Sequence, residues 1–152
     1  MKIGIHQPNF LPWIGYFDRI LISDQFIFFD HVQRPFNKSW ISRVKVSNGG
    51  NVCWLTVPIK KTKRGGELIK DAELAGENIN LVDEIIRKLS NYYHSAPHKN
   101  SMIRLIEAGI AKTQNLADFN INLIITISEA LEIETIFRRS SDLFNGTEGL
   151  FG

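Results

Sequence analysis

The run Gln25-Phe26-Ile27-Phe28-Phe29 constrains the fold more than any other feature of the sequence. A short, nearly continuous apolar run that ends at Asp30 is typical of a strand buried on both faces of a parallel sheet. Parallel neighbours need a crossover connection, and the preceding residues supply one. Residues 2–6 predict a strand, and apolar side chains at three- and four-residue spacing predict a helix over residues 12–22. The N-terminal segment therefore predicts a β-α-β unit.

The next segment carries the signature of a β-hairpin. Residues 41–46 and 52–59 are rich in β-forming side chains, and Ser47-Asn48-Gly49-Gly50-Asn51 between them supplies residues that tolerate positive φ. Beyond a loop at 60–66, the pattern predicts a strand over 68–74 and helices over 79–93, 97–112 and 116–131. A returning strand over 133–137 completes the expected elements, and the tail after it contains no further core-forming segment.

These elements predict one α/β domain over residues 1–152, with a Rossmann-like, mostly parallel sheet, an inserted basic β-hairpin and a helical second half. A chain of 152 residues with 43% hydrophobic residues is the size of one ordinary domain. Its apolar stretches are too short to span a membrane, and the N-terminus lacks the apolar region of a signal peptide. We therefore expect a cytoplasmic protein.

Basic residues are concentrated in one segment. No Asp or Glu occurs between Asp30 and Glu67, whereas this interval contains eight of the 18 Lys and Arg residues. The rest of the chain has ten basic and 16 acidic residues, so a net charge of −6 there balances +8 here to give +2. Such a block indicates a surface that meets anions such as phosphates; a merely solvated basic face is the alternative.

Polar residues follow both N-terminal strands. His6, Gln7 and Asn9 come after the first strand, and Asp30 and Gln33 come after the second. Ligands bind beyond the carboxyl ends of strands in open α/β sheets, so these residues are expected to face one crevice. The helix N-terminus there favours a phosphate or carboxylate. A structural histidine, a helix-capping asparagine and a turn aspartate that pairs with Arg34 are the alternatives.

Two tryptophans of the hairpin region lie among cations. Trp40 and Trp54 alternate with Lys38, Arg43 and Lys45, an arrangement that can stack a base or sugar while the cations hold phosphate. For Trp54 we favour a place in the core. His94 and His98 are four residues apart, but Pro97 disrupts the helix that would bring them to one metal, so no metal site is predicted. No Walker loop, glycine-rich dinucleotide motif or nucleophile elbow is present, and no cofactor can be named.

The sequence HQPNFLPWIGYFD at residues 6–18 resembles the opening signature of the WbqC-like family. The resemblance continues through most of the chain, at residues 26–30, 32–33, 38–40, Arg43, 54–58, Tyr93 and 96–97. The family usually carries an asparagine where Val44 stands and a further polar residue in place of Ile41 or Ser42. Its members also run on beyond the position of Gly152, which suggests a shortened member or a fragment.

The resemblance implies a role in bacterial surface-polysaccharide synthesis, meaning O-antigen or capsule. Some members are described as aminoacyl (glycine) transferases, whose substrate would be an amino sugar on a nucleotide carrier. The N-terminal unit also looks like a distant variant of a nucleotidylyltransferase, with Arg139-Ser140-Ser141 as a second phosphate element, by analogy at the level of the fold.

We therefore predict a transferase of an aminoacyl, acyl or nucleotidyl group that binds a nucleotide or nucleotide sugar. The predicted catalytic residues are His6, Lys38 and Arg43, and the predicted ligand-binding residues are Gln7, Asn9, Asp30, Gln33, Trp40 and Lys60. A noncatalytic module that binds a nucleotide sugar or, less favoured, nucleic acid is the alternative, and a relative lacking part of its active site is a third. Exposed aromatic residues would allow a homodimer.

Overall fold

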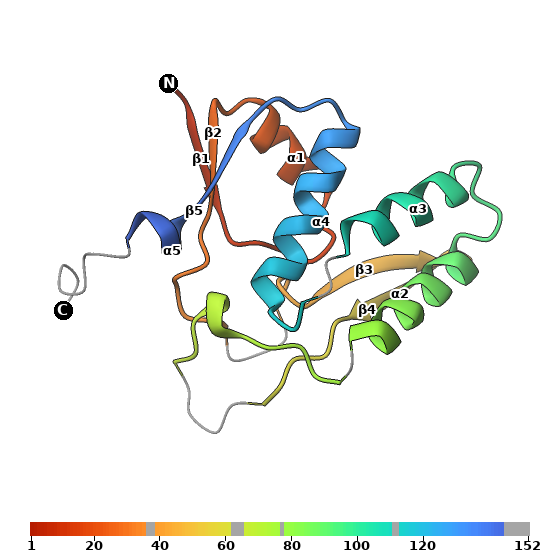
Figure 1. Cartoon of the computed structure of the whole chain (residues 1–152). Coiled ribbons are helices and arrows are strands. Elements are labelled where there is room, and N and C mark those ends of the chain that lie inside the picture. The colour runs from red at the N-terminus through yellow and green to blue at the C-terminus, as the bar shows by residue number, and fades with distance from the viewer. Residues whose placement is uncertain (36–38, 62–65, 77, 111–112, 145–152) are drawn as a thin grey trace.

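A computed structural model of the chain describes residues 1–35, 39–61, 66–76, 78–110 and 113–144 (Figure 1). Three strands form a parallel sheet in the order β1-β2-β5, with bounds Ile3–His6, Gln25–Phe28 and Ile136–Arg139. Helix α1 (Ile14–Leu21) connects β1 to β2, as the apolar spacing predicted. The predicted α/β class and β-α-β unit are therefore confirmed. Three strands are too few to define a Rossmann-like topology, which stays a prediction.

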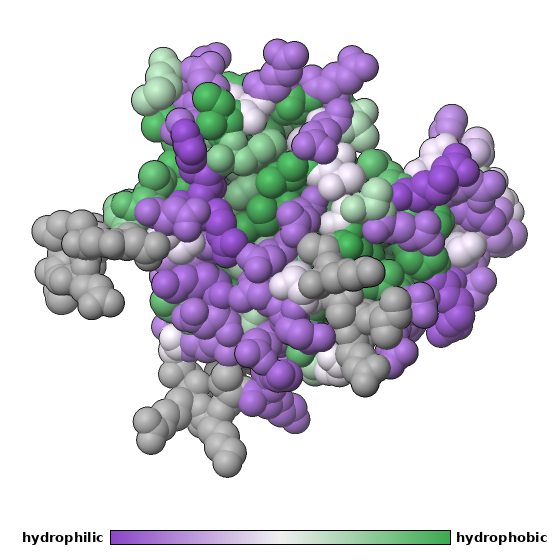
Figure 2. Space-filling view, in the orientation of Figure 1, coloured by the Kyte–Doolittle hydropathy of each residue, from purple (hydrophilic) through white to green (hydrophobic). Residues whose placement is uncertain are grey.

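Only one face of the parallel sheet is buried. Phe26 and Phe28 are 0% and 1% exposed, and the Tyr16 ring of α1 lies 5.5 Å from the Phe26 ring. Figure 1 shows α1 and α4 (Leu116–Ala130) on the same side of the strands. On the other face Ile3 and Ile5 are about half exposed, and apolar side chains reach the surface around the strands at the upper left of Figure 2. On the same face of β2, Gln25 and Ile27 are only partly buried. The prediction that residues 25–29 form a strand buried on both faces is therefore wrong.

The hairpin forms as predicted. Strands β3 (Arg43–Asn48) and β4 (Asn51–Thr56) are antiparallel, and Asn48 pairs with Asn51 across the two-residue turn. Gly49 and Gly50 have φ values of +57° and +88°, which a two-residue hairpin turn requires and which glycine adopts without steric cost. This short turn fixes the register, so the side chains of the two strands alternate predictably between the core and solvent.

The strand predicted over 68–74 does not form. The segment contains a single 3₁₀ turn, η1 (Ile69–Asp71), between isolated bridges that join Gln33 to Leu68 and Ile59 to Leu74. Ile69 and Leu74 are fully buried, but the apolar positions 69, 72 and 74 do not alternate as a strand requires. The segment is instead hydrogen-bonded to the residues that follow β2: the Lys70 N–H donates to the Asp30 carbonyl oxygen at 2.8 Å.

The second half is mostly helical, as predicted. Helices α2 (Asn78–Tyr92) and α3 (Lys99–Gly109) are followed by α4, which begins where the Asn115 side chain accepts a hydrogen bond from the Asp118 N–H. Residues 111–112 of the predicted 97–112 helix lie outside the described residues. Strand β5 begins three residues later than predicted, and α5 (Ser140–Leu143) follows it. No helix of the described residues is long and apolar enough to cross a membrane.

Candidate functional site

The chain turns sharply after β1. His6 donates from ring Nδ1 to the Gln7 carbonyl oxygen at 3.0 Å, and the same oxygen accepts the Tyr16 hydroxyl at 3.0 Å. The His6 ring lies edge-on to the rings of Tyr16 and Trp13, at 4.9 and 5.9 Å between centroids. Burial raises the pKa of the Tyr16 hydroxyl, so that it stays a hydrogen-bond donor. His6 is therefore held in one orientation with Nε2 as its free acceptor.

Hydrogen bonds join the loop after His6 to the segment before β3. The Phe10 N–H donates to the Trp40 carbonyl oxygen at 2.9 Å. From α4, the Asn120 side-chain amide donates to the carbonyl oxygens of Pro8 and Ile41, at 2.9 and 2.8 Å. Asn120 is fully buried, so these bonds are shielded from water. The two segments are thus fixed at a set separation.

An aromatic pocket of about 380 Å³ lies between these two segments. Asn9 and Lys45 carry the charged or amide side chains of its described wall; the described lining residues are Asn9, Phe10, Leu11, Pro12, Trp13, Trp40, Val44 and Lys45. Asn9 is only 4% exposed, and its side chain makes no hydrogen bond with a described residue. The fully buried side-chain atoms without a partner in the described residues are Nδ1 of His31 and Oδ1 of Asn120, and no atom of Asn9 is among them. The Asn9 amide therefore reaches the pocket surface, where its donors and its acceptor are available to a ligand.

The tryptophans form a row that leads away from the pocket. Trp13 lies 6.3 Å from Trp40, and Trp40 lies 5.6 Å from Trp54, between ring centroids. Each of the three is between 42% and 50% exposed, so the expectation that Trp54 belongs to the core is wrong. The Arg43 guanidinium lies 4.0 Å from the centre of the Trp54 ring, and the Lys45 ammonium lies 5.4 Å from it. Cations and aromatic faces therefore share one surface.

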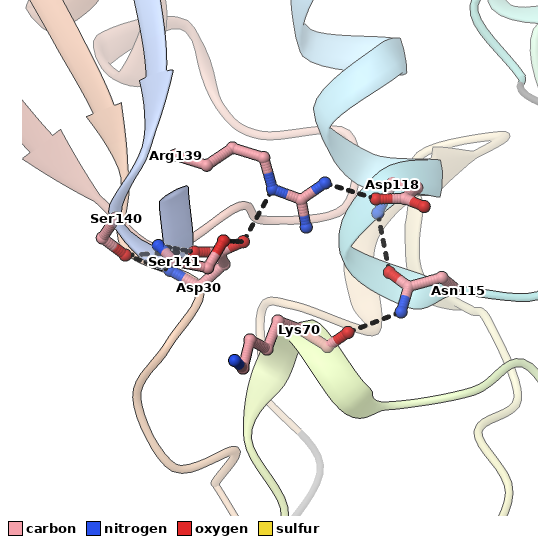
Figure 3. A network of polar contacts seen from close by, with 7 residues as sticks. All are labelled: Asp30, Lys70, Asn115, Asp118, Arg139, Ser140 and Ser141. Carbon is pink, nitrogen blue, oxygen red and sulfur yellow. Dashed lines mark hydrogen bonds and ion pairs between the residues drawn. The ribbon is translucent and has the colours of Figure 1, made fainter. Parts of the chain in front are cut away.

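Asp30 lies in a different polar cluster (Figure 3). Its Oδ1 accepts hydrogen bonds from the Ser140 hydroxyl and the Ser141 N–H, and its Oδ2 accepts from the Ser141 hydroxyl and Arg139 Nε, all between 2.8 and 3.0 Å. Arg139 also contacts Asp118 of α4 at 2.6 Å. Burial alone would raise the pKa of Asp30, but the bonds from Ser141 and Arg139 hold it below its usual value. Asp30 is therefore a fully paired carboxylate.

This cluster differs from the sequence expectations in two ways. Arg34 pairs with Glu67 at 2.8 Å and not with Asp30, whose partner Arg139 is 109 residues away. Ser140 and Ser141 are buried and bound to Asp30, so their hydroxyls are not displayed as a phosphate element. Asp30 does not line the aromatic pocket, and the structure thus separates it from Asn9.

The remaining predicted residues are dispersed. Gln33 is exposed at its bridge with Leu68, and Lys60 pairs with Glu73 in an exposed ion pair. Lys38 lies outside the described residues. His94 binds the Asn91 carbonyl oxygen through Nδ1. In the part of the chain that the structure describes, no group of three or more His, Cys, Asp or Glu side chains is placed to hold a metal ion.

Comparison with known proteins connects the pocket to a family. Residues 7–149 match the sequence model of the WbqC-like protein family. The chain belongs to the WbqC-like protein family. A relative is the uncharacterized protein Rv1507c of Mycobacterium tuberculosis, which is 29% identical over 143 residues, or 93% of this chain and 61% of that protein. The WbqC-like chain thus spans about three fifths of the length of its curated relative. No solved structure matches it significantly.

The segment at residues 6–18, which resembles the opening signature of the family, also supplies the main wall of the pocket. Residues 9–13 supply five of the eight described lining residues, and the His6 ring lies edge-on to the Trp13 ring, 5.9 Å away between centroids. The opposite wall comes from Trp40, Val44 and Lys45. Val44 stands where the resemblance led us to expect an asparagine, so this chain presents an apolar side chain at that point of the wall. In this WbqC-like chain the N-terminal loop and β3 therefore build the candidate site together.

Proposed function

We propose that this WbqC-like chain is a transferase of bacterial surface-polysaccharide biosynthesis that binds a nucleotide or nucleotide sugar in the aromatic pocket. The observation that carries the proposal is a preformed pocket of about 380 Å³ that is lined by half-exposed tryptophans, by Lys45 and by the Asn9 amide, which has no hydrogen-bond partner among the described residues. Small-molecule sites have this composition, namely an apolar cavity with few, well-placed polar groups. Family membership supports the polysaccharide context.

The cations of β3 supply the contacts with phosphate. Lys45 lines the pocket. Arg43, two residues before Lys45 in the sequence, lies over the Trp54 ring. Arg43 is held against the ring, so its guanidinium needs little reorganisation to meet a phosphate oxygen. Lys60 pairs with Glu73 and does not line the pocket, and Lys38 lies outside the described residues, so their contacts with phosphate stay predictions. The cations of β3 would stabilise charge that develops on a transferred phosphoryl or acyl group.

His6 is the proposed general base. Because its Nδ1–H is bound to the Gln7 carbonyl oxygen, Nε2 carries the lone pair that accepts a proton from an acceptor amine or hydroxyl. Its contact with Trp13 places the ring beside the pocket rather than inside it. The acceptor would thus approach along the Trp13 edge. Transfer of an aminoacyl, acyl or nucleotidyl group fits this arrangement.

A thermal-shift screen against nucleotides, nucleotide sugars and acyl donors tests the proposal. A ligand at one hundred times its Kd should stabilise the fold by about 2.7 kcal/mol. Lys45→Gln should reduce the affinity for a phosphate-bearing ligand by about threefold to tenfold. Lys61→Gln is the matched control, since Lys61 is an exposed lysine of the same basic segment that does not line the pocket. Equal ligand affinities of Lys45→Gln and Lys61→Gln would show that Lys45 of β3 does not contribute to ligand binding.

A noncatalytic binding module is the second candidate, and the row of half-exposed tryptophans favours it. Successive aromatic rings beside cations are typical of surfaces that stack single-stranded nucleic acid. Such binding weakens steeply with added salt because phosphate contacts release counterions. Oligonucleotide binding with a salt slope of several phosphates, together with no response to nucleotide sugars, would favour this candidate over the transferase.

A further inference from the structure

The described wall of the aromatic pocket offers few hydrogen-bonding groups. Among its described lining residues, Asn9 and Lys45 have polar side chains, Trp13 and Trp40 each add one indole N–H, and the other side chains are apolar. A pyranose ring carries hydroxyl groups around its whole edge, and each one that is buried needs a hydrogen-bond partner. A nucleobase has two apolar faces and concentrates its polar atoms on the edge. The composition of the wall therefore suits a base better than a sugar.

Asn9 is equipped to read such an edge. Its amide presents two donors and an acceptor oxygen side by side, and it is 4% exposed with no partner among the described residues. Bases carry an adjacent donor and acceptor, so one amide can bind a base with two bonds. The main chain beside it is fixed, because Pro8 and Phe10 are tied to Asn120 and Trp40. Asn9 is thus preorganised rather than free to turn away.

The two tryptophans of the pocket set how a base can lie. The Trp13 and Trp40 ring planes are inclined at 63°, so a flat ring can stack on one and meet the edge of the other. The row continues outward from Trp40 to Trp54, where Arg43 and Lys45 lie. A ligand that inserts its base would therefore place its phosphates toward these cations.

We propose that the pocket is a nucleobase site in which Asn9 binds the base edge, while the ribose, phosphates and any attached sugar lie outside along Lys45 and Arg43. This inference rests on the proposed function and specifies which part of the nucleotide enters the protein. It makes the base, through Asn9, the part of the ligand that gives specificity. Any sugar attached to the nucleotide stays at the surface, where the second substrate of the transfer can reach it.

Tryptophan fluorescence offers a direct test, because all three tryptophans of the chain belong to this row. Titrations use UDP, CDP, ADP and GDP beside ribose 5-phosphate, glucose 1-phosphate and inorganic pyrophosphate. At least one nucleoside diphosphate should quench the fluorescence and bind about tenfold or more tightly than the three compounds that lack a base. Glucose 1-phosphate that binds as tightly as every nucleotide would overturn the base assignment.

Variants of Asn9 separate the base contact from the phosphate contact. Asn9→Leu should reduce the affinity for the tightest-binding nucleoside diphosphate about tenfold and leave the affinity for pyrophosphate unchanged. The matched control is Asn100→Leu, at an exposed asparagine of α3, which should change neither. An unchanged affinity of Asn9→Leu for that nucleotide would also overturn the assignment. If this variant does not fold, the wild-type chain decides: the corresponding free nucleoside should quench the fluorescence, and free ribose should not.

The two proposals fail in different ways. If pyrophosphate and glucose 1-phosphate bind in a manner that depends on Lys45, and a base adds no affinity, the base assignment is wrong and the proposed function stands. If none of the phosphate compounds binds, both are wrong.

Discussion

Polar residues follow two adjacent parallel strands of this chain, and the two groups have opposite environments. Beyond β2, Asp30 is fully buried and four hydrogen bonds from Arg139, Ser140 and Ser141 satisfy its carboxylate. Beyond β1, Asn9 is nearly as buried, yet its amide has no partner among the described residues and lines a pocket. Asp30 and Asn9 thus hold similar positions after a strand, but Asp30 has hydrogen-bond partners within the protein and Asn9 has none among the described residues.

This difference separates a structural cluster from the proposed binding site. A buried polar group whose bonds are all made inside the protein stabilises one conformation and has little left to offer a ligand. An amide that lines a pocket and has no protein partner keeps its donors and its acceptor available to a ligand. Substitutions in the Asp30 cluster should therefore reduce stability, and substitutions in the aromatic pocket should reduce binding.

The largest expected effect is the loss of stability in Asp30→Asn. The change removes the charge that pairs with Arg139 and places an amide N–H₂ among donors, so we expect a loss of about 3 kcal/mol in the free energy of unfolding. Urea denaturation measures it. Asp142→Asn, at an exposed aspartate of α5, is the matched control and should change stability by less than about 0.5 kcal/mol. Wild-type stability of Asp30→Asn would remove the distinction between the two regions.

Acid should weaken the same cluster in the wild-type protein. The pKa of Asp30 is lower in the folded state than the value of about 3.9 in an unfolded chain. The contribution of ionised Asp30 to the free energy of unfolding is therefore complete above the unfolded-state pKa. The contribution is lost as the pH falls from about 4 through the lower folded pKa. Stability measured against pH should therefore decrease over this range more in the wild type than in Asp30→Asn. Parallel pH profiles would show that Asp30 is not the group responsible.

The sequence predicted the local elements well and the polar partners poorly. Apolar spacing located α1, and the Asn48-Gly49-Gly50 turn located the hairpin, because each depends on neighbouring residues. Asp30 and Arg139 lie 109 residues apart, and only the pairing of β2 with β5 brings them together. Arg34, the nearer partner in sequence, binds Glu67 instead. Local patterns carry no information about such pairs.

The candidate site was predicted in part for the same reason. Asn9 and Trp40 were both predicted as ligand-binding residues, and Lys45 was noted among the cations around Trp40; these three residues line one pocket. The sequence held no sign that Trp13 completes it. Asn120, which fastens the two walls, lies on the apolar helix α4 where an asparagine reads as an ordinary helical residue. A polar side chain in the middle of an otherwise buried apolar helix was the signal that could have found it.

Trp40→Ala should show the opposite behaviour to Asp30→Asn. Removing a stacking ring costs about 1 to 3 kcal/mol of binding free energy, or a five- to 150-fold increase in Kd for the ligand identified by the thermal-shift screen. Stability should change little, because Trp40 is 48% exposed. Phe144→Ala is a matched control with 47% exposure outside the pocket, and it should leave Kd unchanged. A large loss of stability without a change in Kd would assign Trp40 to the structural region.

The smallest expected effect tests whether the Asp30 cluster acts as a unit. Ser141→Ala removes one hydroxyl bond to Oδ2, while Arg139 still binds that oxygen and the Ser140 hydroxyl and Ser141 N–H still bind Oδ1. We expect a loss of about 1 kcal/mol in the free energy of unfolding, against no change in the exposed control Ser95→Ala. In the Asp30→Asn background the same serine substitution should cost less, because its partner is already altered. Additive losses in the double variant would mean that each bond to Asp30 acts independently, and the cluster would then be a set of separate contacts rather than one cooperative network.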